Sequence, residues 1–506
     1  MSHGESKANT SHVVQTQDKL SPLQYVKYLS STAFLLIVVL SVFGFSLSWI
    51  LLNFDPSSIS GLIWRSADHA SPAYAMKQTP CSGGNSEKKV CHDGHQSARK
   101  NLIHSSATEC PEYFRWIYED LKPWRTSGVS RETMERGKEH AHFRLVIVKG
   151  KPYLEKFRHS FQTRDLFTIW GFVQLLRFYP GMVPDVELLF RCGDTPVIKK
   201  HDYQQLNASQ PPAMFQYCGS DDAIAVVFPD WSFWGWAELN IRPWRGIVER
   251  IVERSKEITW EKREPQAFWK GNPESPDRRD LMSCNGSMEH DHGVRLYRQN
   301  WREELKEGLK HSHLEDQCTH RYKIYIEGWG WSVSEKYILA CDSMTLFVKN
   351  KYYDFFTRGL MPLKHFWPIR RENKCRDLKF AVQWGNKHPS KARQIGTAGS
   401  QYIREEVKIE NVYAYMLYLL MEYAKLLRFK PEIPKNAVEL SAEGMAGGEG
   451  EARRRFMAES MVRSPSDGAP CAMPPPYDRG ALDAIFKQKE RVLRKVETWT
   501  DHSKYI

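Results

Sequence analysis

The stretch from His320 to Asn350, HRYKIYIEGWGWSVSEKYILACDSMTLFVKN, decides the fold of this chain. It begins as a short apolar strand, passes through a glycine-containing loop into a helical pattern, and ends in a second apolar strand. Strands joined through a helix are typical of parallel pairing. The stretch therefore predicts an α/β layer built on a parallel sheet.

The same alternation of strands and helices extends through the chain on the N-terminal side of this stretch. Strands are expected in FRLVIVKGKPYLE, PDVELLFRCGDTP and EPQAFWKGN, and helices in TRDLFTIWGFVQLLRFYP and RLYRQNWREELKEGL. The later segment NVYAYMLYLLMEYAKLLRF is a strongly apolar helix that we expect to be buried, because Glu422 and Lys425 interrupt it. The whole pattern predicts an α/β fold with parallel sheets.

Residues 33–52, AFLLIVVLSVFGFSLSWILL, form an uncharged apolar run of the length that crosses a bilayer core of about 30 Å. Three lysines precede the run, whereas the first basic residue after it is Arg65, so the positive-inside rule places the N-terminus in the cytosol. We therefore expect a cytosolic tail at 1–32, a transmembrane signal-anchor helix, and a luminal stem at 53–109. The alternative is a cleaved signal peptide, whose apolar region usually has only about 7–15 residues.

The length of 506 residues suits two or three domains. An aromatic-rich entry near Cys110 begins the folded part, for which we expect domains at 110–260 and 261–435. Residues 436–480 are rich in Gly, Ala, Glu, Arg and Pro, which is typical of a flexible insert. A C-terminal tail or helix follows at 481–506.

The charge and the cysteines restrict the partners and the compartment. A formal net charge of +12 favours anionic partners, and a luminal location excludes nucleic acid from that class. Ten cysteines favour disulfides in an oxidising lumen, and the absence of a CxxC pair gives no indication of a zinc site. Asn207 and Asn285 begin luminal N-glycosylation sequons.

Three loops that follow expected strands carry side chains suited to chemistry, because ligands bind at the carboxyl ends of strands in open α/β sheets. Asp194 follows an apolar strand and suits a general base, or else it is a turn aspartate that caps its own backbone. Residues 269–281, WKGNPESPDRRDL, suit a diphosphate through Lys270 and Arg278, or else form a solvated basic loop. The loop at 327–336 suits phosphate at a helix start, or else is an ordinary capping turn.

Several familiar nucleotide and catalytic motifs are missing from the sequence. It has no GxGxxG, no Walker loop, no GxSxG and no DxD, the motif by which many nucleotide-sugar enzymes hold a divalent metal. An enzyme that uses a nucleotide sugar here would therefore have to neutralise the leaving diphosphate with basic residues and backbone amides.

Five segments, in this order, resemble those of the Rumi-type protein O-glucosyltransferases, glycosyltransferase family 90, and are most similar to the plant membrane-anchored branch. They are PDVELLFRCGDTP, FPDWSFWGWAE, AFWKGNPESPDRRDL, HRYKIYIEGWGWSVSEKYILACDS and YAKLLRFKP. The resemblance implies a GT-B type fold, in which two Rossmann-like domains face each other across a cleft. Residues 110–260 would then be the N-terminal catalytic (acceptor) domain and 261–435 the nucleotide-sugar domain. It also implies an inverting, metal-independent transfer that needs no cofactor beyond the UDP-sugar donor.

The resemblance also assigns roles to single residues. Asp194 matches the catalytic base, Arg278 the diphosphate arginine, and Ser332 a serine of the last phosphate-facing loop. Asn272 lies where the family has a serine near the nucleotide sugar. Ser334 falls where soluble members carry an arginine, for which Lys336 or Arg279 could compensate. The substrate-binding set predicted on this basis is Trp231, Trp234, Trp236, Lys270, Gly271, Asn272, Arg278, Ser332 and Lys336, with no metal ligand.

The stretch from Phe228 to Trp244, FPDWSFWGWAELNIRPW, holds four tryptophans. We expect Trp231 and Trp234 to pack the floor of the cleft, and Trp236 and Trp244 to face the acceptor, because indole rings suit the C–H-rich faces of sugars. The alternative is that all four rings are core.

The sequence therefore predicts an enzyme that moves glucose or xylose from a UDP-sugar to a hydroxyl of a luminal protein, in the membrane of the Golgi or endoplasmic reticulum. Two alternatives stay open. One is a cell-wall polysaccharide glycosyltransferase of the same fold. The other is a non-catalytic luminal lectin or scaffold, which the change at Ser334 favours and the retention of Asp194 and Arg278 disfavours.

Overall fold

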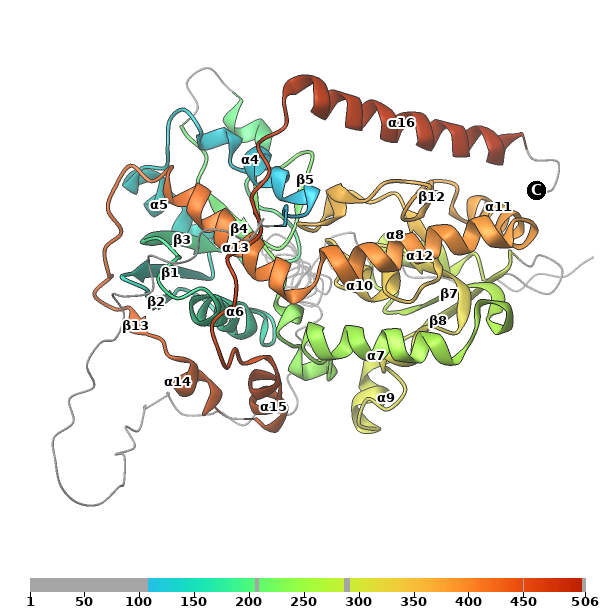
Figure 1. The fold of residues 1–506 in the computed structure, drawn as a ribbon, viewed down its shortest axis with the longest axis horizontal. Coiled ribbons are helices and arrows are strands. Elements are labelled where there is room, and N and C mark those ends of the chain that lie inside the picture. Colours follow the sequence, from blue (N-terminus) through green and yellow to red (C-terminus); the bar gives the residue numbers. More distant parts are fainter. Residues whose placement is uncertain (1–107, 205–208, 286–291, 449, 503–506) are drawn as a thin grey trace, which may run out of the picture. The chain divides into compact units, whose positions relative to one another are not determined.

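Two main β-sheets organise the residues that the computed structural model describes, which are 108–502 without 205–208, 286–291 and 449 (Figure 1). The strands are β1 (Phe143–Val148), β2 (Lys151–Lys156), β3 (Val186–Phe190), β4 (Met214–Gln216), β5 (Gly219–Ser220), β6 (Val226–Val227), β7 (Glu264–Gly271), β8 (Val294–Arg298), β9 (His320–Tyr325), β10 (Met344–Val348), β11 (Tyr352–Tyr353), β12 (Trp367–Ile369) and β13 (Val438–Glu439). The helices are α4 (Trp116–Asp120), α5 (Arg131–Gly137), α6 (Arg164–Phe178), α7 (Trp244–Glu257), α8 (Pro276–Met282), α9 (Trp301–Lys306), α10 (Ser334–Leu339), α11 (Lys374–Lys387), α12 (Pro389–Glu406), α13 (Ile409–Ala424), α14 (Ala442–Ala446), α15 (Glu451–Ser460) and α16 (Arg479–Asp501).

The second sheet has the order β12-β10-β9-β7-β8, and all of its neighbouring strands are parallel. The strand–helix–strand stretch that decides the fold forms its centre, with β9 and β10 side by side and α10 between them in sequence. Helices α11 and α12 pack on this sheet. The parallel α/β layer predicted for this part of the chain is confirmed.

The first sheet has the order β13-β2-β1-β3-β4-β6 and is mixed. Strands β13, β2, β1 and β3 pair antiparallel, whereas β3, β4 and β6 pair parallel. The antiparallel pairing of β1 with β2 follows from the tight turn between them, where Lys149 and Gly150 both adopt positive φ. Two Rossmann-like domains with parallel sheets are therefore the wrong description, and the fold is α/β with one mixed and one parallel sheet.

The predicted N-terminal transmembrane helix is the second correction to the fold class. In the part of the chain that the structure describes, no helix is both long and apolar enough to cross a membrane. Residues 33–52 themselves lie outside the described residues, as do the expected cytosolic tail and almost all of the expected stem.

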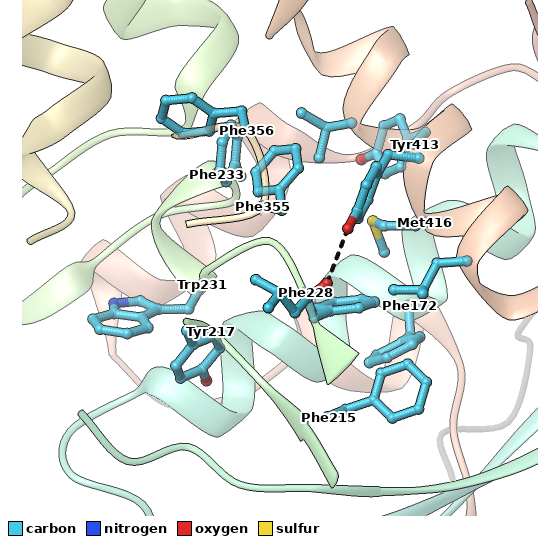
Figure 2. Packing of buried hydrophobic residues seen from close by; sticks show 14 of the residues in the cluster. Phe172, Phe215, Tyr217, Phe228, Trp231, Phe233, Phe355, Phe356, Tyr413 and Met416 are labelled. Atoms are coloured by element: carbon cyan, nitrogen blue, oxygen red, sulfur yellow. Dashed lines mark hydrogen bonds between the residues drawn. The ribbon is translucent and has the colours of Figure 1, made fainter. Parts of the chain in front are cut away.

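The chain returns to the first sheet at helix α13. Helix α13 lies within the region expected as the nucleotide-sugar domain, but its buried side chains join the hydrophobic core of the first sheet. The Tyr423 hydroxyl donates a hydrogen bond to the backbone oxygen of Glu187 in β3. Figure 2 shows Tyr413 and Met416 of this helix beside Phe172 and Phe228. The expected nucleotide-sugar domain, 261–435, therefore includes a helix that packs with the first sheet.

Residues 436–480, expected to be a flexible insert, are folded against the first sheet. Strand β13 pairs with β2, and Phe456 and Met457 of α15 are buried. A disulfide joins Cys471 to Cys110. The composition hid this packing, because the apolar residues of this segment are scattered among many Gly, Glu, Arg and Pro residues and give no periodic signal.

Two further disulfides, Cys284–Cys375 and Cys318–Cys341, lie in the second half of the chain. Cys192 and Cys218 are reduced and buried. The predicted presence of disulfides is confirmed.

Candidate active site

Asp194 lies just beyond the C-terminal end of β3 and forms an ion pair with Arg164 in the first turn of α6. The Arg164 Nη1 atom lies 2.7 Å from Asp194 Oδ1, and the Asp194 side chain is 33% exposed. Within the described residues the second oxygen, Oδ2, makes no hydrogen bond. The ion pair therefore orients the carboxylate and leaves one oxygen available to a ligand.

Two aromatic rings hold Arg164 in place. Its guanidinium carbon lies 4.5 Å from the ring centroid of Trp231 and 5.0 Å from that of Phe161. Trp231 is buried and packs edge-on against Tyr217, which Figure 2 also shows. Cation–π contacts of this kind stabilise a buried arginine. Trp231 therefore acts on Asp194 through Arg164, a connection that sequence reasoning missed because the two partners lie on separate elements.

The other three tryptophans of this stretch divide between core and surface. Trp234 is fully buried and donates from Nε1 to the Tyr413 hydroxyl at 3.1 Å. Trp244, expected to face the acceptor, is instead a core residue that begins α7 and donates to the backbone oxygen of Val407. Trp236 is half-buried, and its ring centroid lies 4.9 Å from that of Trp231. Trp236 is thus the only one of the four with a partly exposed ring.

Arg278 lies in the first turn of α8, where carbonyl groups fix its direction. Its Nε donates to the backbone oxygen of Glu327 at 3.1 Å and its Nη1 to that of Asn272 at 3.2 Å. Its Nη2 donates to the Ser332 hydroxyl at 3.0 Å. Burial lowers the pKa of Arg278 to about 10, against the opposing influence of Tyr325 and Asp194. The guanidinium keeps its charge at neutral pH.

The loop after β9 brings these groups together. A Cβ placed on Gly330 would lie only 1.7 Å from the backbone oxygen of Asp194, so only glycine permits this approach. The corresponding position on Gly328 is 3.5 Å from Arg278 Nη2. The Ser332 hydroxyl lies 2.8 Å from that of Ser334. Asp194, Arg278 and Ser332 come from three segments that are far apart in sequence. The loop after β9 therefore brings these residues together at one candidate site.

Lys336 is not part of this group. Its Nζ is fully buried, 2.9 Å from Asp230 Oδ2 and 2.8 Å from the Ser232 hydroxyl. The side chain expected to compensate for the change at Ser334 is therefore engaged in a core ion pair. Arg279 is exposed on α8.

Lys270 lies in a separate cavity of about 590 Å³, which Tyr297, Gln299 and His311 also line. Its Nζ donates to the backbone oxygen of His311 at 2.6 Å. Gly271 ends β7, and a Cβ there would meet the ring of Trp269. The Asn272 side chain accepts from the backbone N–H of Glu274, so this residue reaches Arg278 only through its carbonyl.

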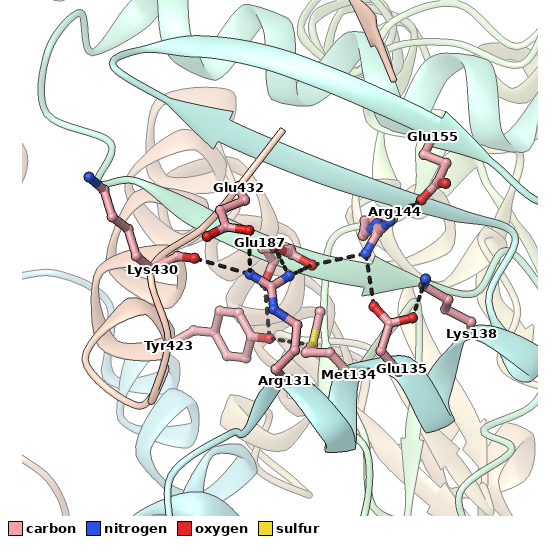
Figure 3. Close-up of polar contacts among 10 residues, drawn as sticks. All are labelled: Arg131, Met134, Glu135, Lys138, Arg144, Glu155, Glu187, Tyr423, Lys430 and Glu432. Carbon is pink, nitrogen blue, oxygen red and sulfur yellow. Dashed lines mark hydrogen bonds and ion pairs between the residues drawn. The ribbon is translucent and has the colours of Figure 1, made fainter. Parts of the chain in front are cut away.

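Two other carboxylates, in or next to β3, are alternative candidates for the general base. In the structure each of them is paired with another group. Glu187 is fully buried and pairs with Arg131 and Arg144, as Figure 3 shows. Asp185 accepts from the backbone N–H of Lys149 at the opposite end of the strand. Only Asp194 lies at the carboxyl end, where the other two loops meet.

The sequence also predicts two glycosylation sites and no metal ligand. Asn285 is exposed, whereas Asn207 lies outside the described residues. Over the described ranges, no group of three or more His, Cys, Asp or Glu side chains is placed to hold a metal ion. Glycosylation at either asparagine stays a prediction.

Comparisons with known proteins identify the family. The profile of glycosyl transferase family 90 matches residues 105–500. Human protein O-glucosyltransferase 1 is 26% identical over 361 residues, which cover 68% of this chain and 88% of the human protein. The O-glucosyltransferase rumi homolog of Anopheles gambiae is 23% identical over 68% of this chain and 86% of its own length. O-glucosyltransferase rumi of Drosophila melanogaster is 23% identical over 64% of this chain and 80% of its own length.

These matches confirm the resemblance to Rumi-type proteins, and the plant membrane-anchored branch stays a prediction. The matched region contains both sheets and all three loops at the candidate site. The chain belongs to glycosyltransferase family 90 and is a glycosyltransferase.

Proposed function

We propose that this chain moves a sugar, glucose or xylose, from a UDP-sugar to a hydroxyl group of a protein, with inversion at the anomeric carbon. The observation that carries the proposal is the meeting of the Asp194 loop with Arg278 and Ser332. The relatives named as protein O-glucosyltransferases support a protein acceptor and favour glucose as the donor sugar.

The geometry supports a direct displacement in which Asp194 is the base. Its Oδ2 takes the proton of the acceptor hydroxyl while the hydroxyl oxygen bonds to the anomeric carbon. The bond from that carbon to the β-phosphate oxygen breaks, and UDP leaves with the additional negative charge. Arg278 and the Ser332 hydroxyl, which are hydrogen-bonded to each other, stabilise this charge. Arg164 keeps the carboxylate in one orientation throughout.

We also propose that no metal ion takes part. The sequence has no DxD, and Arg278 supplies a positive charge of the kind that a metal would otherwise provide. Transfer from UDP-glucose or UDP-xylose to a folded protein acceptor is expected to persist in EDTA. Mass spectrometry of the acceptor, with and without chelator, measures this directly. Loss of transfer in EDTA that manganese restores would contradict the metal-free proposal, and no transfer from any UDP-sugar would favour the lectin or scaffold.

The lumen of the Golgi or endoplasmic reticulum is the compartment that we propose. Three disulfides, one of which joins residues 361 positions apart, support an oxidising environment.

Replacing Arg278 by Ala is expected to weaken UDP binding by about 10- to 150-fold, because a charge-assisted hydrogen bond contributes about 1.5–3 kcal/mol. Isothermal titration of UDP into the purified protein measures the change. Arg279→Ala is the matched control, since this neighbour has the same charge but is exposed on α8. Equal UDP affinity in both variants would show that the diphosphate lies elsewhere, provided that both melt at the wild-type temperature.

A further inference from the structure

Trp329 is the exception among the tryptophans that the structure describes. The residue is 49% exposed, whereas each of the others is buried or half-buried. A large apolar ring in water forgoes the stabilisation that burial would give, so an exposed indole beside a functional site is a candidate binding surface. The position of Trp329 in the fold therefore indicates what its ring can bind.

The backbone around Trp329 is closed into a tight loop. The Gly328 N–H donates to the carbonyl oxygen of Gly330 at 2.9 Å, which places Trp329 at the tip of the loop. On one side Gly330 touches the backbone of Asp194, and on the other Gly328 faces the guanidinium of Arg278. The backbone of Trp329 thus lies between one residue that touches Asp194 and another that faces Arg278.

The next tryptophan, Trp331, anchors the loop from the buried side. Its ring lies 5.4 Å from that of Tyr217 and 6.0 Å from that of Trp231, and it is almost completely buried. The two residues of this Trp-Gly-Trp sequence therefore have opposite roles. Trp331 is held in the core, which leaves the backbone of Trp329 little freedom to move.

We propose that Trp329 is a stacking platform for a pyranose ring, an inference that rests on the proposed function. In the proposed displacement the transferred sugar lies between a diphosphate at Arg278 and a hydroxyl at Asp194, and these are the two residues that the glycines on either side of Trp329 approach. The face of an indole ring is electron-rich and attracts the weakly positive C–H groups on the face of a pyranose, while the flat ring also excludes water. The ring that stacks is either the transferred sugar of the donor or a sugar already present on the acceptor.

Steady-state kinetics of Trp329→Ala and Trp329→Phe test the proposal. Stacking contributions of aromatic rings predict a rise in KM of about 5- to 10-fold for the alanine variant, and a smaller rise for phenylalanine, which keeps an aromatic face. A rise in the KM of the UDP-sugar identifies the donor ring, and a rise only for a glycosylated acceptor identifies the acceptor ring. Phe486→Ala is the matched control, because this ring is 52% exposed on α16 and contacts none of the three loops.

Fluorescence quenching supplies a readout that does not depend on turnover. Acrylamide is expected to quench an exposed component that Trp329→Phe lacks. A UDP-sugar should protect this component more than UDP alone if the donor ring stacks, and a glycosylated acceptor should protect it if the acceptor ring stacks. Unchanged KM values together with no protection by either ligand would overturn the proposal. If Asp194→Asn still abolishes transfer in that case, the proposed function stands without the platform.

Discussion

Asp194→Asn is expected to lower turnover by about 10²–10⁴-fold while leaving UDP-sugar affinity nearly unchanged. The amide keeps the size of the carboxylate and can still accept a hydrogen bond from Arg164, but it cannot take up the proton of the acceptor. The loss corresponds to the usual contribution of a positioned general base. A fall in kcat without a rise in donor KM would mark an interaction that matters in the transition state rather than in binding.

The control for this variant is Asp185→Asn, which makes the same chemical change at the other end of β3. Asp185 accepts a hydrogen bond from the backbone of Lys149 and lies away from the loops that carry Arg278 and Ser332. Its activity should stay near that of the wild type. Near-normal turnover of Asp194→Asn, or an equal loss in both variants, would remove Asp194 from the mechanism.

Lys336→Met is expected to destabilise the protein by about 3–5 kcal/mol, which is the usual cost of leaving one member of a buried ion pair without its partner. Asp230 and Lys336 are both almost inaccessible to solvent. Burial works against the charge of Lys336, but Asp230, Tyr337 and Asp354 outweigh it and raise the pKa of this lysine. Methionine has a similar shape but leaves the carboxylate of Asp230 unpaired. Urea unfolding followed by circular dichroism measures the loss.

Two further variants separate the charge effect from a packing effect. Lys351→Met removes an exposed lysine that pairs with Asp222, and surface pairs contribute at most about 1 kcal/mol. In Asp230→Asn/Lys336→Met the carboxylate that is paired with Lys336 is neutralised as well, so part of the lost stability should return. A double variant no more stable than Lys336→Met alone would show that the pair acts through packing. A single variant as stable as the wild type would contradict the buried-pair account.

The position of this ion pair also concerns the active site. Lys336 belongs to α10, which begins directly after the loop that carries Ser332, whereas Asp230 follows β6 of the first sheet. The pair therefore connects the loop that carries Ser332 to the sheet that carries Asp194. We expect the loss of this ion pair to make the distance between Asp194 and Arg278 more variable. It should also destabilise the fold.

The sequence by itself determined the elements whose signals are local. The alternation of apolar strands with a helical segment predicted the parallel second sheet, because both periodicities can be read within about thirty residues. The strand pattern identified the three loops, and the family resemblance then assigned roles to Asp194, Arg278 and Ser332. These residues could be found because each loop directly follows an apolar strand.

The tertiary structure alone decided which side chains meet. Lys336 is paired with Asp230, 106 residues away, and Arg164 with Asp194, 30 residues away, and no local pattern predicts either partner. The same holds for residues 436–480. Their composition does not favour order, and they fold because β13 pairs with the edge of the sheet at β2. The strand directions of the first sheet depend on one tight turn and on which edges are free. Such contacts arise from packing between distant segments, whereas a sequence pattern reports only the face that each segment buries.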